Sequence, residues 1–304
     1  MTSQPTAEEL FADQRGNLMA VAYRLLGTVS DAEDVLQDVF ERWLKQDRSS
    51  VENPAAYLTT MTTRAGLDHL RSAKTKREVY VGPWLPEPMP TPDSFSEQAA
   101  GNPAAVALLD ESLTIGYLHL LEQLTPLQRA CYLLHDVFDF PYREIAAMVG
   151  EDEANCRQLA SRSRSKLKAT RPDVYETPVP EVEAEVVNQL ISAVIGGDIG
   201  QVMALMTDDV VHISDGGEHH RAARQPVVGP ERVARLLVNL AKRVPSDDTA
   251  VEFRQLRVNL QPAILVLLDG APLILQVVEL EGRKLRRSYA VVNPEKLQSV
   301  MAEA

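Results

Sequence analysis

The chain has 304 residues and a formal net charge of −12. That length is enough for two or more domains, and the acidic balance argues against a protein that coats DNA non-specifically. The first nine residues lack a signal-peptide pattern, and no apolar run reaches the ~18 residues of a membrane span, so we expect a cytoplasmic protein without membrane contact. Cys131 and Cys156 are expected to be small core residues in a reducing compartment.

Residues 8–78 are predicted to form a helical domain. Its clearest helix follows a capping box at Ser30–Glu33 and points its apolar residues inward at helical spacing. The opposite face carries an acidic stripe. A stripe of this kind is either a solvated face or a docking site for a basic protein surface. It consists of Asp31, Asp34, Gln37, Asp38 and Glu41.

A third helix is predicted to start at Asn53-Pro54 and to end in the basic cluster of residues 71–77. This cluster is either a flexible connection or a nucleic-acid contact. Several polar side chains on the helix and in the cluster could reach bases or phosphates. They are Arg64, Asp68, His69, Arg71, Lys74, Lys76 and Arg77.

Residues 79–110 are predicted to be an extended linker, because they contain six prolines and no basic residue. Residues 111–172 are again predicted to be helical. Thr125–Gln128 has the sequence of a capping box, Gly150 is placed to end a short helix, and Asp152 is placed to cap the next one. A short helix, a glycine turn and a basic second helix are typical of a helix-turn-helix.

The second helix has no acidic residue between positions 154 and 169. Its polar side chains form two adjacent stripes, whose Arg, Asn and Gln residues suit base edges and whose Lys and Ser residues suit phosphates. The alternative interpretation is a generic basic, solvated helix. On an acidic chain, such a helix would bind DNA weakly without a partner. The predicted DNA-binding residues are Asn155, Arg157, Gln158, Ser161, Arg162, Arg164, Lys166 and Lys168.

Residues 173–182 are predicted to be a hinge and residues 183–300 an α+β domain, with helices first and then an antiparallel meander of strands. The basic residues of segment 283–287 are expected to mark a charged sheet edge. His212, Asp215, Glu218, His219 and His220 do not have the spacing of a compact zinc site, so we expect no metal and no cofactor.

Three sets of residues carry a resemblance to a known family. Residues 31–43, the helix of residues 53–77, and Leu124–Arg129 with Glu144–Ala146 resemble the sigma-two and sigma-four domains of extracytoplasmic-function sigma factors. Residues 183–300 resemble a SnoaL-like domain, as in the SigJ-like subgroup. The resemblance implies all-α sigma-two and sigma-four domains, the latter with a helix-turn-helix, followed by an α+β cone-shaped SnoaL-like domain.

The resemblance also implies partners for each part. The acidic stripe matches the surface that docks the clamp helices of the largest RNA polymerase subunit, and the sigma-four domain matches the part that binds the flap of the second subunit. The helix ending near Arg77 matches the reader of the promoter's minus-ten element, and residues 155–168 match the reader of the minus-thirty-five element. Many family members have Asn at the position of Arg64, and the subgroup often has a third glycine at Glu218.

The last domain allows more than one interpretation. We expect it to regulate a non-enzymatic initiation factor by packing against the sigma domains or the linker and shifting their geometry. The expected regulatory contacts are Trp84, Leu85, Pro86, Asp215, Gly216 and Gly217. An enzyme would have to use Asp215 or His212 for acid–base chemistry. A ligand-binding domain fused to a DNA-binding activator is the other alternative, so a small ligand of unknown identity in the cone is left open.

Overall fold

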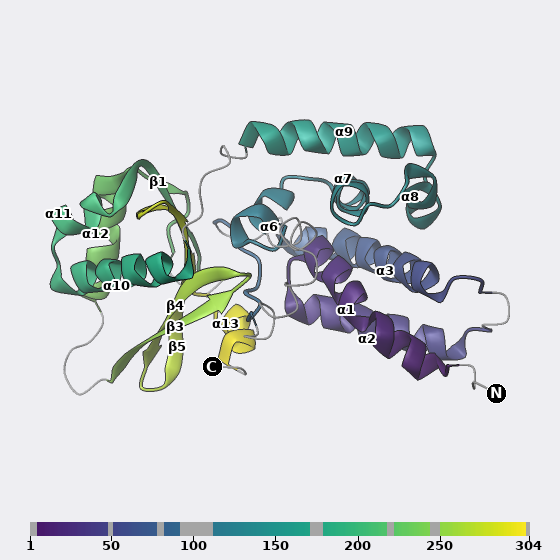
Figure 1. The fold of residues 1–304 in the computed structure, drawn as a ribbon, viewed down its shortest axis with the longest axis horizontal. Coiled ribbons are helices and arrows are strands. Elements are labelled where there is room, and N and C mark those ends of the chain that lie inside the picture. The colour runs from purple at the N-terminus through teal and green to yellow at the C-terminus, as the bar shows by residue number, and fades with distance from the viewer. Residues whose placement is uncertain are drawn as a thin grey trace. The chain divides into compact units, whose positions relative to one another are not determined.

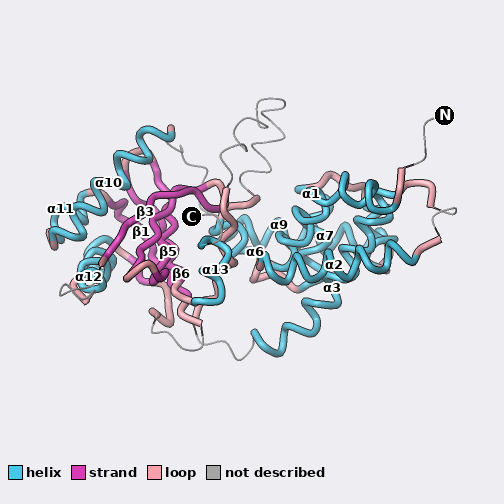
Figure 2. Tube along the Cα trace, turned by 90° about the horizontal axis from the view of Figure 1, so that it is seen from below, coloured by secondary structure: helices cyan, strands magenta, loops and turns pink. Residues whose placement is uncertain are grey.

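The computed structural model divides the chain into two compact units (Figure 1). The first contains helices from residues 1–79 and 117–172, and the second contains the sheet and the linker that precedes it. Figure 2 shows that the strands all belong to the second unit. Within the described part of the chain, no helix is long and apolar enough to cross a membrane. The structure describes residues 5–47, 51–77, 82–91, 112–170, 179–217, 222–243 and 250–301.

The amino-terminal helices of the first unit are α1 (Ala7–Leu26), α2 (Val29–Lys45) and α3 (Pro54–Arg77). As predicted, α1 ends at Gly27, which adopts a left-handed φ of 78°. The capping box predicted at Ser30 is wrong, because α2 already begins at Val29 and Thr28 has the extended backbone of an N-cap residue. The apolar face of α2 is buried as predicted and includes Trp43, whose indole donates to the Ala7 carbonyl at 2.9 Å.

The carboxy-terminal helices of the first unit form the predicted helix-turn-helix. Thr125 makes the expected capping box, and Asp152 accepts a hydrogen bond from the Asn155 amide at 2.8 Å. Cys131 and Cys156 are buried in the core beneath these helices and carry free thiols. The elements are α6 (Ile115–Leu121), α7 (Pro126–Tyr132), a π-helical segment (Leu133–Val137), α8 (Tyr142–Val149) and α9 (Glu153–Thr170).

The second unit has a six-stranded sheet with the strand order β2-β1-β6-β5-β4-β3. Figure 1 shows its helices packed beside this sheet, as expected for the α+β class. The helices are α10 (Pro180–Gly196), α11 (Ile199–Ala204), α12 (Pro230–Ala241) and α13 (Pro294–Met301). The strands are β1 (Met206–Asp215), β2 (Val227–Val228), β3 (Val251–Val258), β4 (Gln261–Leu268), β5 (Ala271–Glu281) and β6 (Lys284–Val291).

Two expectations about this sheet were wrong. Strands β3 to β6 are an antiparallel meander, but β1 pairs with β6 in parallel. Strand β6 therefore lies between β1 and β5, and the basic segment 283–287 does not mark a sheet edge. Neighbouring acids compensate its charges instead: Arg283 pairs with Glu185 at 2.6 Å and Arg286 with Glu281 at 2.6 Å.

The alternation of side chains along the strands gives the sheet two buried faces. On one face, Ile264, Val278 and Leu285 pack with residues of α10, α11 and α12. On the other face, Leu265, Val277 and Tyr289 pack with α13 and with Leu85 of the linker. The linker therefore contributes to the core of the second unit.

Candidate functional site

The acidic stripe of α2 divides into two parts. Asp31 lies apart from the others: its side chain is only partly exposed, and it pairs with His69 of α3 at 3.2 Å. This pair joins α2 to α3, although the two residues were predicted to serve different partners. The remaining members are exposed to solvent, namely Asp34, Gln37, Asp38 and Glu41.

Arg64 connects α3 with the helix-turn-helix. Its Nε donates to the Met148 carbonyl at 2.9 Å, and its guanidinium also donates to the Ala147 carbonyl at 2.8 Å. Both carbonyls belong to the last turn of α8, where the helix dipole attracts a cation. A side chain predicted to contact DNA is thus bound within the first unit.

The other predicted residues of α3 follow Arg64 along the helix. Arg71 and Asp68 form an exposed i,i+3 pair at 3.2 Å. Helix α3 continues through the basic cluster to Arg77. The side chains of Lys74, Lys76 and Arg77 lie outside the described residues.

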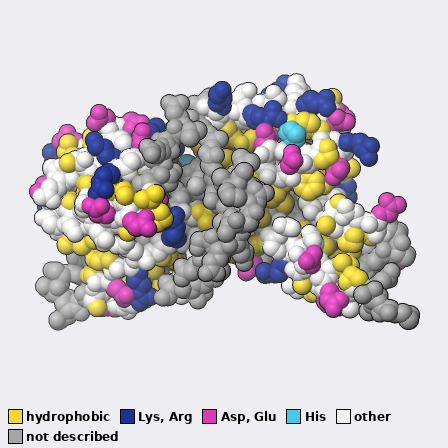
Figure 3. All heavy atoms as spheres, in the orientation of Figure 1, with side chains coloured by type: hydrophobic (Ala, Val, Ile, Leu, Met, Phe, Trp, Pro, Cys, Tyr) yellow, Lys and Arg dark blue, Asp and Glu magenta, His cyan; other side chains and the backbone are white. Residues whose placement is uncertain are grey.

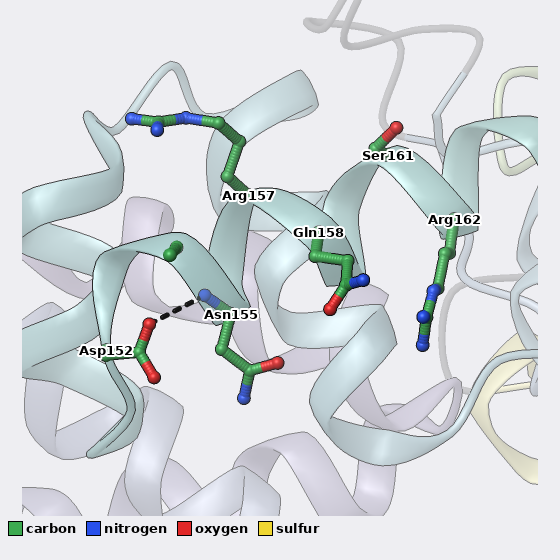
Figure 4. A pocket seen from close by; sticks show the side chains of 7 residues that line it. Asp152, Asn155, Arg157, Gln158, Ser161 and Arg162 are labelled. Carbon is green, nitrogen blue, oxygen red and sulfur yellow. Dashed lines mark hydrogen bonds between the residues drawn. The ribbon is translucent and has the colours of Figure 1, made fainter.

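Helix α9 presents the two predicted polar stripes. In Figure 4, Asn155, Gln158 and Arg162 point to one side of the helix, and Arg157 and Ser161 point away from it. Together with Asp152 and Ala154, these five residues line an open hollow. Lys and Arg side chains are visible along the face that carries α9 (Figure 3). The exposed groups include donors and acceptors suited to base edges.

Several of the basic side chains of α9 have partners inside the first unit. Arg157 pairs with Glu153 at 2.6 Å, Arg164 pairs with Asp136 at 2.6 Å, and Lys166 donates to the Gln123 carbonyl. The exposed Arg157–Glu153 pair is of a kind that is weak and exchanges readily with other partners, whereas Asp136 is only 22% exposed. Ser161, Arg162 and Lys168 are exposed as well. Sequence reasoning did not find Asp136, because it lies 28 residues before Arg164.

A buried ion pair in the second unit holds the linker. The Lys296 ammonium lies 2.7 Å from Asp215 Oδ2, and both side chains are almost completely buried. Asp215 also accepts from the amides of Leu85, at 2.8 Å, and Gly217, at 3.0 Å. Lys296 donates to the Leu85 carbonyl, and its Nζ lies 4.0 Å from the centroid of the Trp84 ring. We call Trp84, Leu85, Asp215 and Lys296 the linker clamp.

Backbone pairing extends the clamp along the linker. Thr91 donates to the Arg257 carbonyl at 3.0 Å, and the Asn259 amide donates to the Met89 carbonyl at 2.8 Å. The Asn259 side chain accepts from the Met89 amide at 2.9 Å. The linker is therefore bound at the end of strand β3 in the manner of an added strand.

The turn predicted to make regulatory contacts is tightly packed. Gly216 and Gly217 are buried, as is Pro86. Gly217 has a φ of 64°, and a Cβ there would lie 2.9 Å from the side chain of Asn293. A side chain at Gly217 would therefore be strained by the backbone and would clash with Asn293.

Lys296 is the important residue of the clamp that sequence reasoning missed. In α13 it lies on the buried stripe with Leu297 and Val300. A lysine at an inward position of an amphipathic helix is unusual unless an acid pairs with it. That signal was present in the sequence, but it did not identify Asp215 as the partner.

The two residues considered for acid–base chemistry have structural partners. Asp215 belongs to the clamp, and His212 Nδ1 lies 2.9 Å from Ser288 Oγ. Burial lowers the pKa of His212 to about 4. Among the described residues, no three His, Cys, Asp or Glu side chains lie close enough to hold a metal. Glu218, His219 and His220 lie outside the described residues.

Comparison with known proteins identifies the family. The family described as Sigma-70 region 2 matches residues 10–76, and Sigma-70 region 4 matches residues 116–167. The chain is 40% identical over 233 residues to the ECF RNA polymerase sigma factor SigJ of Mycobacterium tuberculosis, covering 77% of this chain and 72% of that protein. This chain belongs to the extracytoplasmic-function sigma factors.

A solved structure of SigJ and one further relative match almost the whole length of this sigma factor. The crystal structure of Mycobacterium tuberculosis SigJ matches it with a TM-score of 0.72 and 32% identity, covering 97% of this chain and 99% of that one. The probable ECF sigma factor SigI of the same species is 28% identical over 291 residues, covering 95% of this chain and 94% of that protein. The predicted fold classes of the sigma-two, sigma-four and SnoaL-like parts are confirmed.

Membership of the family establishes the general function. Sigma factors are transcription initiation factors that bind core RNA polymerase and promoter DNA, and they are not enzymes. Region 2 corresponds to α1–α3, and region 4 corresponds to α6–α9. The predicted transcriptional function is confirmed at this level.

Proposed function

We propose that this sigma factor docks on core polymerase through the exposed part of its acidic stripe and through region 4. The exposed face of α2 carries the proposal, because Asp34, Asp38 and Glu41 present carboxylates to solvent. Such a face complements a basic helical surface, and the resemblance assigns it to the clamp helices of the largest subunit. Region 4 would bind the flap of the second subunit.

Promoter recognition is proposed to be shared between α9 at the minus-thirty-five element and α3 at the minus-ten element. These elements are about 80 Å apart along B-form DNA, whereas Arg64 of α3 is bonded to α8 beside α9. While Arg64 holds α3 against α8, α3 and α9 cannot reach two promoter elements that lie this far apart. Regions 2 and 4 would therefore separate when polymerase positions them on a promoter.

The SnoaL-like domain is proposed to regulate this process through the linker clamp. The linker joins regions 2 and 4, so its length and stiffness set how far apart the two DNA-reading helices can lie. Asp215 and Lys296 hold Leu85 and Trp84 in place. This segment of the linker is then not free to span the distance between regions 2 and 4. Asp215 is thus proposed to act as a structural anchor rather than as an acid or base.

Run-off transcription with purified core enzyme tests the proposal directly. The wild-type chain should give promoter-dependent transcripts, and the double substitution Asp34→Ala with Asp38→Ala should weaken core binding about tenfold. The matched control is Asp13→Ala, which removes an exposed carboxylate of α1 outside the stripe. If core affinity is unchanged in the double variant, the docking assignment is wrong.

The regulatory role needs a separate experiment. Trp84→Ala removes the ring beside Lys296 but keeps the buried ion pair, so the second unit should stay folded. We expect transcript yield to change at equal core affinity. The control is Pro83→Ala in the same linker. An unchanged yield in Trp84→Ala would contradict regulation through the clamp.

A further inference from the structure

Tyr142, the first residue of α8, contacts two arginines of α9. The Arg157 guanidinium lies over its ring, 5.3 Å from the ring centroid. Arg164 donates to its hydroxyl at 2.6 Å. Positions 157 and 164 are seven residues apart, which is about 10 Å along a helix. The tyrosine side chain therefore spans two turns of α9.

The Tyr142 ring is itself held in place by neighbouring residues. It packs on the His135 imidazole, with the ring centroids 4.0 Å apart and an interplanar angle of 33°. The His135 Nδ1 lies 3.0 Å from the Phe140 carbonyl oxygen. The ring also packs against the core cluster that contains Ile145 and Cys156. Its position is consequently fixed by the hydrophobic core of region 4.

Both arginines pair with a carboxylate at 2.6 Å, but the Asp136 side chain is 22% exposed and the Glu153 side chain is 48% exposed. Arg164 bonds the Asp136 carboxylate at 2.6 Å, so its charge is compensated within region 4. Arg157 has an uncharged aromatic partner and an exposed pair with Glu153. DNA phosphates would repel the Glu153 carboxylate, and an exposed pair is easily exchanged. The aromatic contact can persist on DNA and leaves the full charge of Arg157 available.

We propose that Tyr142 is a positioning residue for promoter readout, which orients Arg157 toward base edges and secures Arg164 as an anchor between α9 and the segment before α8. The inference rests on the proposed role of α9. A flexible arginine loses rotamer freedom when it binds, and an arginine already oriented by a ring loses less. Tyr142 therefore raises sequence discrimination without touching a base itself.

The experiment uses the holoenzyme and a duplex that the wild-type holoenzyme selects from random DNA. Binding is compared with the same duplex after substitution of the bases under α9, and the ratio of the two affinities measures discrimination. Tyr142→Ala should lower this ratio about tenfold. Tyr142→Phe keeps the ring beside Arg157 and should retain most of the ratio. Core affinity and the melting temperature are measured for both variants.

A double-mutant cycle distinguishes positioning from a general structural role. If Tyr142 acts through Arg157, Tyr142→Ala should not lower the ratio further in an Arg157→Ala background. A loss that is equal in both backgrounds, or a loss of ratio in Tyr142→Phe equal to that in Tyr142→Ala, overturns the inference. So does an unchanged ratio in Tyr142→Ala. If wild-type holoenzyme enriches no sequence, the proposed function fails together with the inference.

Discussion

Arg129 and Arg64 each bond the carboxyl end of a helix across regions 2 and 4 of this sigma factor, and they use the same chemistry in different surroundings. Arg129 of α7 donates to the Leu25 carbonyl in the last turn of α1 at 2.9 Å. Arg64 of α3 donates to the Met148 and Ala147 carbonyls in the last turn of α8. Each region thus supplies a cation to the carboxyl end of a helix in the other.

The two arginines differ in how deeply their side chains are buried. Arg129 is 3% exposed, and it also pairs with Glu122 at 2.8 Å. Arg64 is exposed to solvent, and water can replace either of its acceptors. A buried bridge leaves unpaired groups when it breaks, whereas an exposed one does not. We infer that Arg64 is the contact that opens readily, and that Arg129 holds the regions together until polymerase separates them.

Arg129→Ala should have the largest effect on stability. It leaves the partly buried Glu122 carboxylate and two carbonyls without their cation, so the free energy of unfolding should fall by about 3–5 kcal/mol. Urea denaturation measures this change. Arg129→Lys keeps the charge and should lose less. A loss below about 1 kcal/mol in Arg129→Ala would mean that this bridge is as replaceable as Arg64.

The pH dependence of stability tests whether His212 stays buried and uncharged without an acidic partner. Burial lowers its pKa to about 4, below the ordinary 6.5. As pH falls from 6.5 to 4, the unfolded chain takes up the proton before the folded chain does. Stability should therefore decrease by about 3 kcal/mol across this range, and His212 should contribute no change above it.

His212→Gln is the control for this pH dependence. Glutamine does not titrate and can still bond Ser288, so the variant should lose less stability on acidification than the wild type. Denaturant unfolding at a series of pH values gives the comparison. Equal slopes in the two proteins would show that the pKa of His212 is not lowered in the folded chain.

Arg64→Ala should cost only about 1 kcal/mol of stability, because both freed carbonyls can be solvated. Its main effect should be on geometry: fluorescence energy transfer between labels on regions 2 and 4 should report a larger mean separation. Arg71→Ala, on the same helix, is the matched control and should leave the separation unchanged. An unchanged separation in Arg64→Ala would rule out its role as the opening contact.

Arg71→Ala should also give the smallest stability change. The Arg71–Asp68 pair is exposed on both sides, and such pairs contribute less than about 0.5 kcal/mol. The same denaturation assay applies to it. A larger loss of stability would show that solvent exposure alone does not distinguish a replaceable arginine such as Arg64 from a stabilising one such as Arg129.

The sequence predicted what local periodicity determines. The apolar and acidic faces of α2, the Gly150 turn and the two stripes of α9 all follow from spacing within one or two helices. The resemblance pointed to Trp84, Leu85 and Asp215 of the clamp, but Lys296 was missed, because it bonds Asp215 across 81 residues and Leu85 across 211 residues. The bond from Arg64 to Met148 spans 84 residues. The parallel pairing of β1 with β6 was missed for the same reason.

The strand order has a consequence for synthesis on the ribosome. Strand β6 joins β1 to β5, so the sheet cannot close until residues 284–291 have emerged. Lys296 follows still later, more than 120 residues after α9. At about 5–20 residues per second, this delay lasts roughly 6–25 seconds. We expect newly made copies to fold their promoter-reading helices some seconds before the linker can be clamped.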